Sequence, residues 1–330
     1  MRSPFRLTPR VLSLSGEIAR WLGRCEGPGE VRPQPRLRRS NRIRTVQGTV
    51  AIEGNSLSTE QITALLDGKR VRGPAREIRE VRNVVAAYDR AASWRATSAR
   101  DLLAAHALVM EGLVADAGRW RSRDVGVIRG SKVGHLAPGA ARVPALMRGL
   151  FSFLARDRTV PLLVKACVFH YEIEFIHPFS DGNGRLGRLW QHVILRAESP
   201  AFAFVPTESI IKSRQREYYA VLSTCDRAGD STAFVEFALD ALREALAELA
   251  GALRPSRPDA LERLSSARRR LGGRAFSRKD YLGINPTIAT ATASRDLRRG
   301  VARGLLRLVG DRATARYRFR GSGRGGGPGS

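Results

Sequence analysis

The stretch HPFSDGNGRLGR, residues 177–188, places one imidazole, one carboxylate, two guanidinium groups and three glycines within twelve residues. Before it, apolar residues recur at helical spacing over residues 162–176, and Pro178 disfavours helical geometry at His177. We therefore predict a helix that ends at the imidazole. After it, an apolar stripe over residues 186–194 predicts a second helix, which begins inside the stretch.

The charges of this loop indicate what it binds. Arg185 and Arg188 lie in the first turns of the second helix, where the helix dipole is already positive, which costs a few tenths to ~1 kcal/mol per charge unless an anion is present. Gly182 and Gly184 allow backbone N–H groups to converge on a small anion such as phosphate. Asp181 would repel a phosphate alone, so its presence fits a divalent cation that bridges the two. The loop therefore predicts a site for a nucleotide with Mg²⁺.

Two further residues of the loop have separate predicted roles. His177 is the one group there that can titrate near neutral pH, which suits a general base acting on an incoming hydroxyl. Phe179 is predicted to be a core anchor that fixes the shape of the loop.

The stretch resembles the signature of the Fic family, HPFx[DE]GNGRxxR, at every fixed position. So many specified residues within twelve make a chance match very improbable. The resemblance implies an all-α fold and the transfer of the AMP moiety of ATP to a Ser, Thr or Tyr hydroxyl of a target protein, with release of pyrophosphate.

The resemblance also implies a role for each matching residue. His177 would deprotonate the hydroxyl, Phe179 would anchor the loop, and Asp181 would hold Mg²⁺ on the α- and β-phosphates. Arg185 would bind the phosphate chain and Arg188 would orient the γ-phosphate. The other positions implied to contact the nucleotide are the anion hole of Gly182, Asn183 and Gly184, together with Leu186, Gly187, Tyr218 and Tyr219.

A second motif precedes this core. The stretch TVAIEGN, residues 49–55, resembles the family's inhibitory pattern [ST]xxxE[GN], on a helix that we expect over about residues 42–54. In the class with such a helix before the core, the Glu pairs with the second arginine of the loop and displaces the γ-phosphate. The resemblance therefore implies autoinhibition by Glu53 through Arg188. An ordinary exposed glutamate is the alternative interpretation.

Residues 118–139 interrupt the helical pattern with glycines, a short β-prone run and a proline, which predicts a hairpin or flap. The resemblance implies that this flap docks a segment of the target by strand pairing. The flap residues expected near the target are Lys132, Val133, Gly134 and His135.

Helical periodicity dominates from about residue 16 to residue 253, so we predict an all-α main body. The expected segments are a flexible N-terminus over 1–14, N-terminal helices over 15–113, a Fic core over 114–253, a linker at 254–258, a winged helix-turn-helix at 259–320 and a disordered tail at 321–330.

The winged helix is predicted from two helices followed by a β-prone pair around a Gly-Asp turn. Its basic face, suited to phosphates, would consist of Arg295, Arg298, Arg299, Arg312 and Arg316. The alternative is a module that binds protein or packs on the core. Retention on duplex DNA that weakens with rising salt would separate the two.

The net charge of +26 fits a polyanionic partner, although the excess of Arg over Lys is also what a GC-rich genome produces. Three widely spaced cysteines suggest neither a disulfide framework nor a zinc site, and we expect a cytoplasmic protein without export signal or membrane span. ATP and a target protein are the implied partners; self-modification and a homodimer stay open.

Two other functions remain compatible with the sequence. One is the reverse chemistry, hydrolytic removal of AMP from a protein, for which Glu53 could position water. The other is a regulator whose winged helix binds DNA while the Fic core senses a nucleotide.

Overall fold

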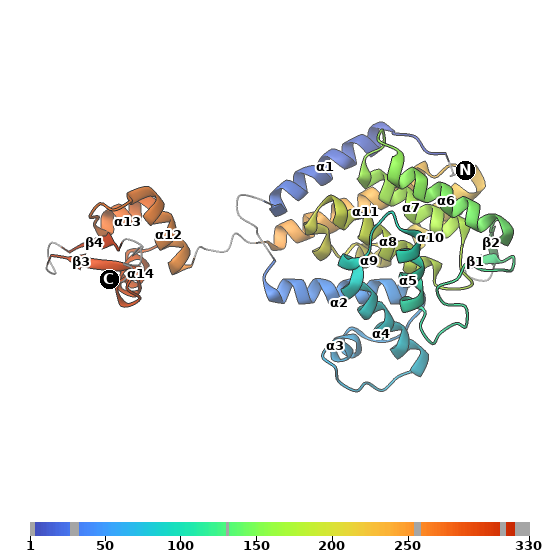
Figure 1. Cartoon of the computed structure of the whole chain (residues 1–330), viewed down its shortest axis with the longest axis horizontal. Helices are drawn as coiled ribbons and strands as arrows, with labels where there is room; N and C mark the ends of the chain where they lie inside the picture. Colours follow the sequence, from blue (N-terminus) through green and yellow to red (C-terminus); the bar gives the residue numbers. More distant parts are fainter. Residues whose placement is uncertain (1–3, 27–32, 130–131, 254–258, 311–314, 321–330) are drawn as a thin grey trace, which may run out of the picture. The chain divides into compact units, whose positions relative to one another are not determined.

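The computed structural model describes residues 4–26, 33–129, 132–253, 259–310 and 315–320, without side chains for 127–129 and 132–135 (Figure 1). The predicted linker at 254–258 and tail at 321–330 lie outside the described residues. The chain divides into two compact units, Met1–Arg254 and Pro255–Ser330. In the described part, no helix is both long and apolar enough to cross a membrane.

The first unit is built around helix α7 (Leu162–Ile176). Thirteen of its fifteen residues are buried, so it is surrounded by other elements and has no solvent face. It packs against α8 (Asn183–Glu198), α11 (Thr232–Ala252) and α6 (Val143–Arg156). Since α7 leads into the loop at 177–182 and α8 leaves it, the predicted site starts from a deeply buried part of the core.

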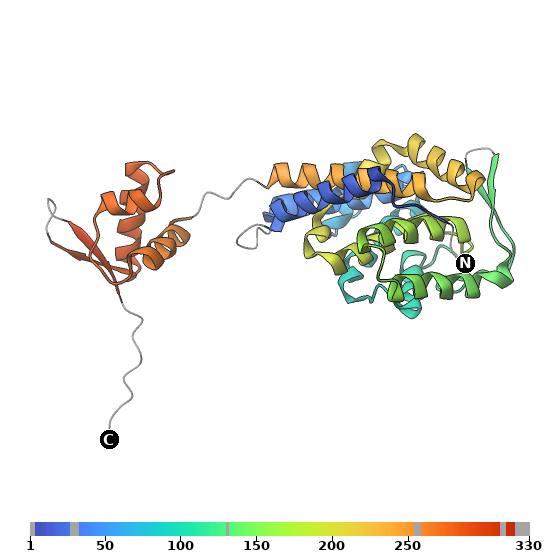
Figure 2. The ribbon, with the colours of Figure 1, turned by 90° about the horizontal axis from the view of Figure 1, so that it is seen from above.

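The N-terminal stretch predicted to be flexible contains part of a helix instead. Helix α1 (Pro9–Glu26) lies along α11 (Figure 2), and Val11 and Leu14 are buried. The prediction over 1–14 was wrong for these residues because the apolar stripe continues toward the N-terminus, through positions 11, 14, 18 and 22. Upstream of the helix, the carbonyl of Pro4 accepts a hydrogen bond of 2.8 Å from Ser231 N–H.

The first unit is all-α, as predicted, with one small hairpin among its described residues. Its other helices are α2 (Pro35–Ile52), α3 (Thr59–Leu66), α4 (Ala75–Arg90), α5 (Ala99–Val109), α9 (Thr207–Ser213) and α10 (Gln215–Ala228), with short 3-10 turns at η1 (Ala91–Ser93), η2 (Ala140–Arg142) and η3 (Pro200–Phe204). The hairpin pairs β1 (Gly126–Arg129) with β2 (Lys132–Leu136), antiparallel, with a bulge between Val127 and Ile128.

Helix α2 contains the predicted inhibitory motif and docks through a close backbone contact. It begins at Pro35, seven residues earlier than expected. A Cβ added at Gly48 would lie 2.5 Å from the carbonyl carbon of Glu208 on α9, so α2 reaches α9 only because residue 48 has no side chain. Asn41 Nδ2 also donates to the carbonyl of Phe204 at 2.8 Å.

The second unit has a core of its own. It comprises α12 (Ala260–Leu271), α13 (Arg278–Ile284) and α14 (Thr290–Ala302), then the antiparallel pair β3 (Leu306–Val309) and β4 (Arg316–Phe319). A buried ion pair of 2.6 Å joins Arg263 to Asp296, and Tyr281 donates a hydrogen bond to the same carboxylate at 3.1 Å. The apolar core includes Leu264, Phe276, Leu297, Leu306 and Phe319.

The close approach at Gly48 leads to a first prediction. Gly48→Ala places a methyl group against immobile backbone, so we expect the free energy of unfolding to fall by about 1–3 kcal/mol. The matched control is Gly23→Ala on α1, where an added Cβ has no atom within 4 Å. It should be neutral or stabilising by about 0.5–1 kcal/mol. Urea denaturation measures both, and equal effects of the two substitutions would contradict the close contact.

Candidate active site

The loop at 177–182 begins with an unusual backbone conformation. His177 has φ 50° and ψ 58°, and it is the non-glycine residue with positive φ among those that the structure describes. Its N–H still donates to the carbonyl of Ile173 at 3.0 Å, so α7 ends at the imidazole, as predicted. The side chain is half-buried, with Nδ1 3.4 Å from the carbonyl oxygen of Glu174. The imidazole therefore lies at the end of a buried helix.

Phe179 holds the middle of the loop in the core. Its side chain is fully buried, its N–H donates to Asn183 Oδ1 at 3.0 Å, and its carbonyl accepts from Asn183 Nδ2 at 2.9 Å. The amide of Asn183 is therefore used to close the loop on itself. The phenyl ring stacks on the ring of His106, with centroids 3.6 Å apart and an interplanar angle of 11°.

His106 on α5 packs against the loop, and its contact with the loop was not predicted from the sequence. Its Nδ1 accepts a hydrogen bond from Gly118 N–H at 2.9 Å, so the ring proton is on Nε2, which donates to the carbonyl of Asp181 at 2.9 Å. Burial lowers the pKa of His106 to about 4, which keeps the ring neutral. In the sequence it stands in an apolar helical run and carries no signal of a contact with the loop.

The start of α8, where we predicted an anion site, leaves several backbone N–H groups without a partner in the helix. Gly182 adopts φ 82° at the helix N-cap, and a Cβ there would lie 2.5 Å from Met110 Sδ. The first intrahelical bond joins Leu186 N–H to the carbonyl of Gly182 at 3.0 Å. The N–H groups of residues 183–185 precede that bond, so the helix itself offers them no acceptor. They point out of the helix end, where an anion binds.

Leu186 and Gly187 face the core instead of the end of the helix. Leu186 is fully buried in the core, and a Cβ at Gly187 would lie 2.9 Å from His170 Cδ2. Both residues therefore help α8 to pack closely against α7. Their contact with a nucleotide stays a prediction.

Arg188 is buried and paired with the predicted inhibitory motif. Its Nη2 lies 2.6 Å from Glu53 Oε1, and its Nε donates to Thr49 Oγ1 at 2.9 Å. Burial by itself would lower the pKa of Arg188, but the carboxylates of Glu53 and Glu174 raise it above its ordinary value. Nη1 has no hydrogen-bond partner among the described residues. The guanidinium is therefore charged and keeps one free donor group.

The carboxylate of Glu53 lies over the predicted anion site at Gly184. A Cβ on Gly184 would overlap Glu53 Oε1 and would lie 3.2 Å from Arg188 Nη1. Glu53 follows the last residue of α2, and its side chain is about one-third exposed. An anion at the start of α8 and the carboxylate of Glu53 would therefore compete for the same space and the same guanidinium.

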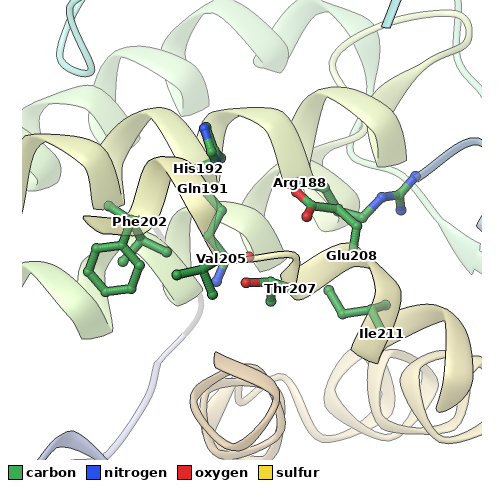
Figure 3. A pocket seen from close by; sticks show the side chains of 9 residues that line it. Arg188, Gln191, His192, Phe202, Val205, Thr207, Glu208 and Ile211 are labelled. Carbon is green, nitrogen blue, oxygen red and sulfur yellow. The ribbon is translucent and has the colours of Figure 1, made fainter. Parts of the chain in front are cut away.

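A small cavity of about 10 Å³ lies behind Arg188, lined by residues of α8, η3 and α9 (Figure 3). Such a volume holds about one water molecule, so this cavity is too small for a nucleotide. Glu208 lines this cavity, and its Oε1 accepts from the hydroxyl of Tyr88 at 2.7 Å. Burial raises the pKa of Glu208.

Arg185 belongs to a second charged group. Its Nη2 lies 3.2 Å from Asp181 Oδ1 and its Nη1 lies 3.4 Å from Glu80 Oε1. Arg76, also on α4, reaches Asp181 Oδ2 at 3.3 Å. The sequence did not predict Glu80 or Arg76, because they lie a hundred residues upstream on a helix with an ordinary polar face.

The predicted metal ligand Asp181 is a single carboxylate. Within the described ranges, no group of three or more His, Cys, Asp or Glu side chains could hold a metal ion. Mg²⁺ commonly binds through one or two carboxylates plus substrate phosphates, so a lone carboxylate beside an anion site fits an ion that arrives with the nucleotide. It does not fit a resident metal.

The two predicted tyrosines lie in different places. Tyr218 is fully buried, and its hydroxyl donates to Glu174 Oε1 at 3.0 Å and lies 3.2 Å from His170 Nε2. Tyr219 is half-buried, and its hydroxyl donates to the carbonyl of Ile52 at 3.0 Å. Contact with a nucleotide stays a prediction for both.

Tyr219 is one of three residues that hold the end of α2, which we call the α2 clamp: Lys212, Gln215 and Tyr219. Lys212 Nζ donates to the carbonyl of Ala51 at 2.9 Å, and Gln215 Nε2 donates to that of Ile52 at 2.8 Å. These carbonyls belong to the last turn of α2, and that of Ala51 also accepts from Gly54 N–H at 3.2 Å. The clamp therefore fixes the segment from which Glu53 projects.

The four predicted flap residues, Lys132, Val133, Gly134 and His135, lie on β2. Within the hairpin, β2 pairs with β1, with Val133 opposite Ile128 and His135 opposite Val127. Because this sheet has two strands, each strand keeps one edge whose backbone groups are not used within the sheet. Strand pairing with another chain would use such an edge.

Residues 96–195 match the family model described as Fic/DOC family. The solved structure of a Fic family protein from Desulfovibrio desulfuricans G20 is 42% identical, covers 98% of this chain and 100% of its own, and has a TM-score of 0.73. The curated protein adenylyltransferase fic-1 of Caenorhabditis elegans is 29% identical over 67% of this chain and 44% of its own. A protein adenylyltransferase Fic of Culex quinquefasciatus is 29% identical over 62% and 41%. The chain thus spans less than half the length of these curated relatives.

The buried ring of His106 leads to a prediction on pH. Its pKa is lowered from 6.5 to about 4 on folding, so below pH 6.5 the unfolded chain takes up a proton that the folded chain does not. Stability from this group is fully present above pH 6.5 and is lost as pH falls toward 4. We expect His106→Gln to flatten the pH dependence of unfolding over this window, by up to about 1.4 kcal/mol per pH unit.

The comparison is made by urea denaturation from pH 8 to pH 4.5. At pH 8 the difference between wild type and His106→Gln reports packing alone, which serves as the internal control. Parallel stability curves would show that His106 is protonated to the same extent in both states.

Proposed function

The chain belongs to the Fic family, and on that premise we propose that it is a protein adenylyltransferase that moves AMP from ATP to a hydroxyl of a target protein. The observation that carries the proposal is the start of α8: outward N–H groups of residues 183–185 and two buried arginines lie at one loop with the imidazole of His177. A triphosphate is an anion that the outward N–H groups can bind, and a hydroxyl supplies the proton that an imidazole accepts.

In the proposed reaction, His177 takes the proton of the target hydroxyl while the oxygen attacks the α-phosphorus. The bond from that phosphorus to the bridging oxygen breaks, and pyrophosphate leaves. Arg185 and the N–H groups of the loop stabilise the negative charge on the phosphate oxygens. Asp181 would hold Mg²⁺ with the phosphates, where the ion neutralises part of their charge.

We further propose that the structure represents an inhibited state. Glu53 Oε1 takes the guanidinium of Arg188 at 2.6 Å and lies over Gly184. If the buried guanidinium loses the carboxylate of Glu53, another anion must replace it, and the γ-phosphate can do so. Because both anions would occupy the same space, they cannot bind Arg188 together. With Glu53 in place, ATP would bind without its γ-phosphate on Arg188, which misplaces the α-phosphorus.

Hydrolytic removal of AMP is the second candidate, and the position of Glu53 favours it. The same carboxylate that lies over the anion site could orient a water molecule toward a phosphorus bound there. In that case Glu53 would be needed for activity instead of opposing it.

For the second unit we propose a winged helix. α13 and α14 follow one another and are succeeded by the β3–β4 hairpin, in the order of that fold. Arg295, Arg298 and Arg299 are exposed on α14 while Asp296 faces inward, which leaves three guanidiniums on the solvent side. Arg312, predicted for the same face, lies outside the described residues. Phosphates of DNA or an acidic protein surface are both compatible partners for this face.

The main test uses ATP labelled at the α-phosphate with Mg²⁺, and label on protein as the readout. We expect Glu53→Gly to raise labelling about 10–100-fold, because a brake worth roughly 1.4–2.8 kcal/mol is removed. Adding His177→Ala should abolish it. Glu60→Gln is the control, since Glu60 is an exposed carboxylate on α3 whose side chain bonds Ser58. Loss of AMP from a modified protein that requires Glu53, with no labelling by any variant, would favour the second candidate.

The α2 clamp leads to a separate prediction. Tyr219→Phe removes one hydrogen bond to the end of α2, worth about 0.5–1.5 kcal/mol, so labelling should rise roughly 2–10-fold with Glu53 still present. Affinity for ATP, measured by calorimetry in the Glu53→Gly protein, should not change. Tyr317→Phe in the second unit is the control. Weaker ATP binding without any gain in labelling would instead assign Tyr219 to the nucleotide pocket.

A further inference from the structure

Arg121 is a buried arginine that lies just before the hairpin and reaches the catalytic loop. Its side chain is 1% exposed. Its Nε donates to the carbonyl of His177 at 2.7 Å, and its Nη2 lies 3.4 Å from the carbonyl of Ile176. Its backbone N–H donates to the carbonyl of Pro178 at 2.9 Å. One residue thus holds three successive carbonyls where α7 ends.

The same guanidinium also holds both ends of the hairpin. Nη1 donates to the carbonyl of Arg123, which precedes β1, at 2.8 Å. Nη2 donates to the carbonyl of Pro138, which follows β2. The two carbonyls lie on either side of the hairpin, so its base is closed around the side chain of Arg121.

The charge of Arg121 is balanced mainly by these carbonyl oxygens. The carboxylate in reach is Asp124 Oδ1, 3.8 Å from Nη1, on a side chain that is 80% exposed. Burial lowers the pKa of Arg121, which the charge of Asp124 opposes. The end of α7 offers the negative pole of a helix dipole, which favours a cation there.

The geometry also explains why the residue is an arginine. Four carbonyls lie around one planar group, in two directions, and a guanidinium has five N–H donors in a fixed fork. A lysine has three donors on one atom, and it could reach the carbonyls of the loop or those of the hairpin but not satisfy both sets.

We infer that Arg121 is a positioning residue that couples the hairpin to the imidazole of His177. Two hydrogen bonds hold the backbone of His177 in its left-handed conformation. Its N–H donates to the carbonyl of Ile173, and its carbonyl accepts from Arg121 Nε. Since the hairpin is fixed by the same guanidinium, a segment docked on β2 and the imidazole are placed relative to each other by one side chain. This inference rests on the proposed function for its catalytic meaning, but its structural content is testable without it.

The first measurement is amide hydrogen exchange of the full-length chain. Arg121→Gln should accelerate exchange about tenfold in both residues 126–136 and residues 176–182. Exchange in residues 42–54 should remain unchanged. Arg123→Gln is the matched control, because Arg123 is exposed and contributes its backbone carbonyl to the contact. Faster exchange in residues 176–182 alone would overturn the coupling and leave Arg121 as a cap of α7.

The second measurement separates positioning from binding. In the Glu53→Gly protein, Arg121→Gln should lower the rate of self-labelling by AMP about 100-fold, as expected for a misplaced base, with the Kd for ATP unchanged. Arg121→Lys should restore only part of the rate. A rate within twofold of the parent would overturn the inference.

Two further outcomes keep the inference separate from the proposed function. If Arg121→Gln fails to fold, Asp124→Ala replaces it, since that exposed side chain contacts Nη1 and accepts from Ala140 N–H at 2.7 Å. It should accelerate exchange in both segments to a smaller degree, and no change in either would count against coupling. If no variant labels protein but both segments still open together, the transferase proposal fails and the coupling stands.

Discussion

The ion pair between Arg188 and Glu53 is the contact on which the state of the candidate site depends. Arg188 is buried, and an anion close to its guanidinium offsets the cost of burying the charge. In this structure that anion comes from the end of α2, at 2.6 Å. The start of α8 also attracts negative charge, through its dipole and its outward N–H groups. One carboxylate therefore satisfies both demands, and the site is complete without a ligand.

Such an arrangement needs α2 to be held accurately but not irreversibly. The helix is placed by a side chain from its first half, Asn41, by the backbone contact at Gly48 and by the clamp at its last turn. Several of its buried side chains are polar, among them Asn41, Thr45 and Thr49. Hydrogen bonds of this kind can be exchanged for bonds to water at a small net cost, unlike the burial of an apolar face. A helix with such a partly polar interface is suited to reversible inhibition.

Local patterns predicted the parts of the chain whose structure is local. The end of α7 at His177 follows from Pro178, and the buried stripe of α8 follows from its periodicity. The prediction was wrong over part of residues 1–14, where two positions of an apolar stripe were not recognised. It also missed His106, Glu80, Lys212 and Arg121, which reach the site from helices and turns distant in the sequence.

The order of the residues alone predicted the family resemblance, the all-α fold and the chemistry of the loop. Each of these predictions depends on residues that are close together along the chain. Only the tertiary structure decided which groups support that loop. A neutral ring stacks on Phe179, a buried arginine joins the hairpin to His177, and the carboxylate of Glu53 lies at the start of α8. The physical reason is that each of these contacts depends on how helices rotate and cross, which local periodicity does not specify.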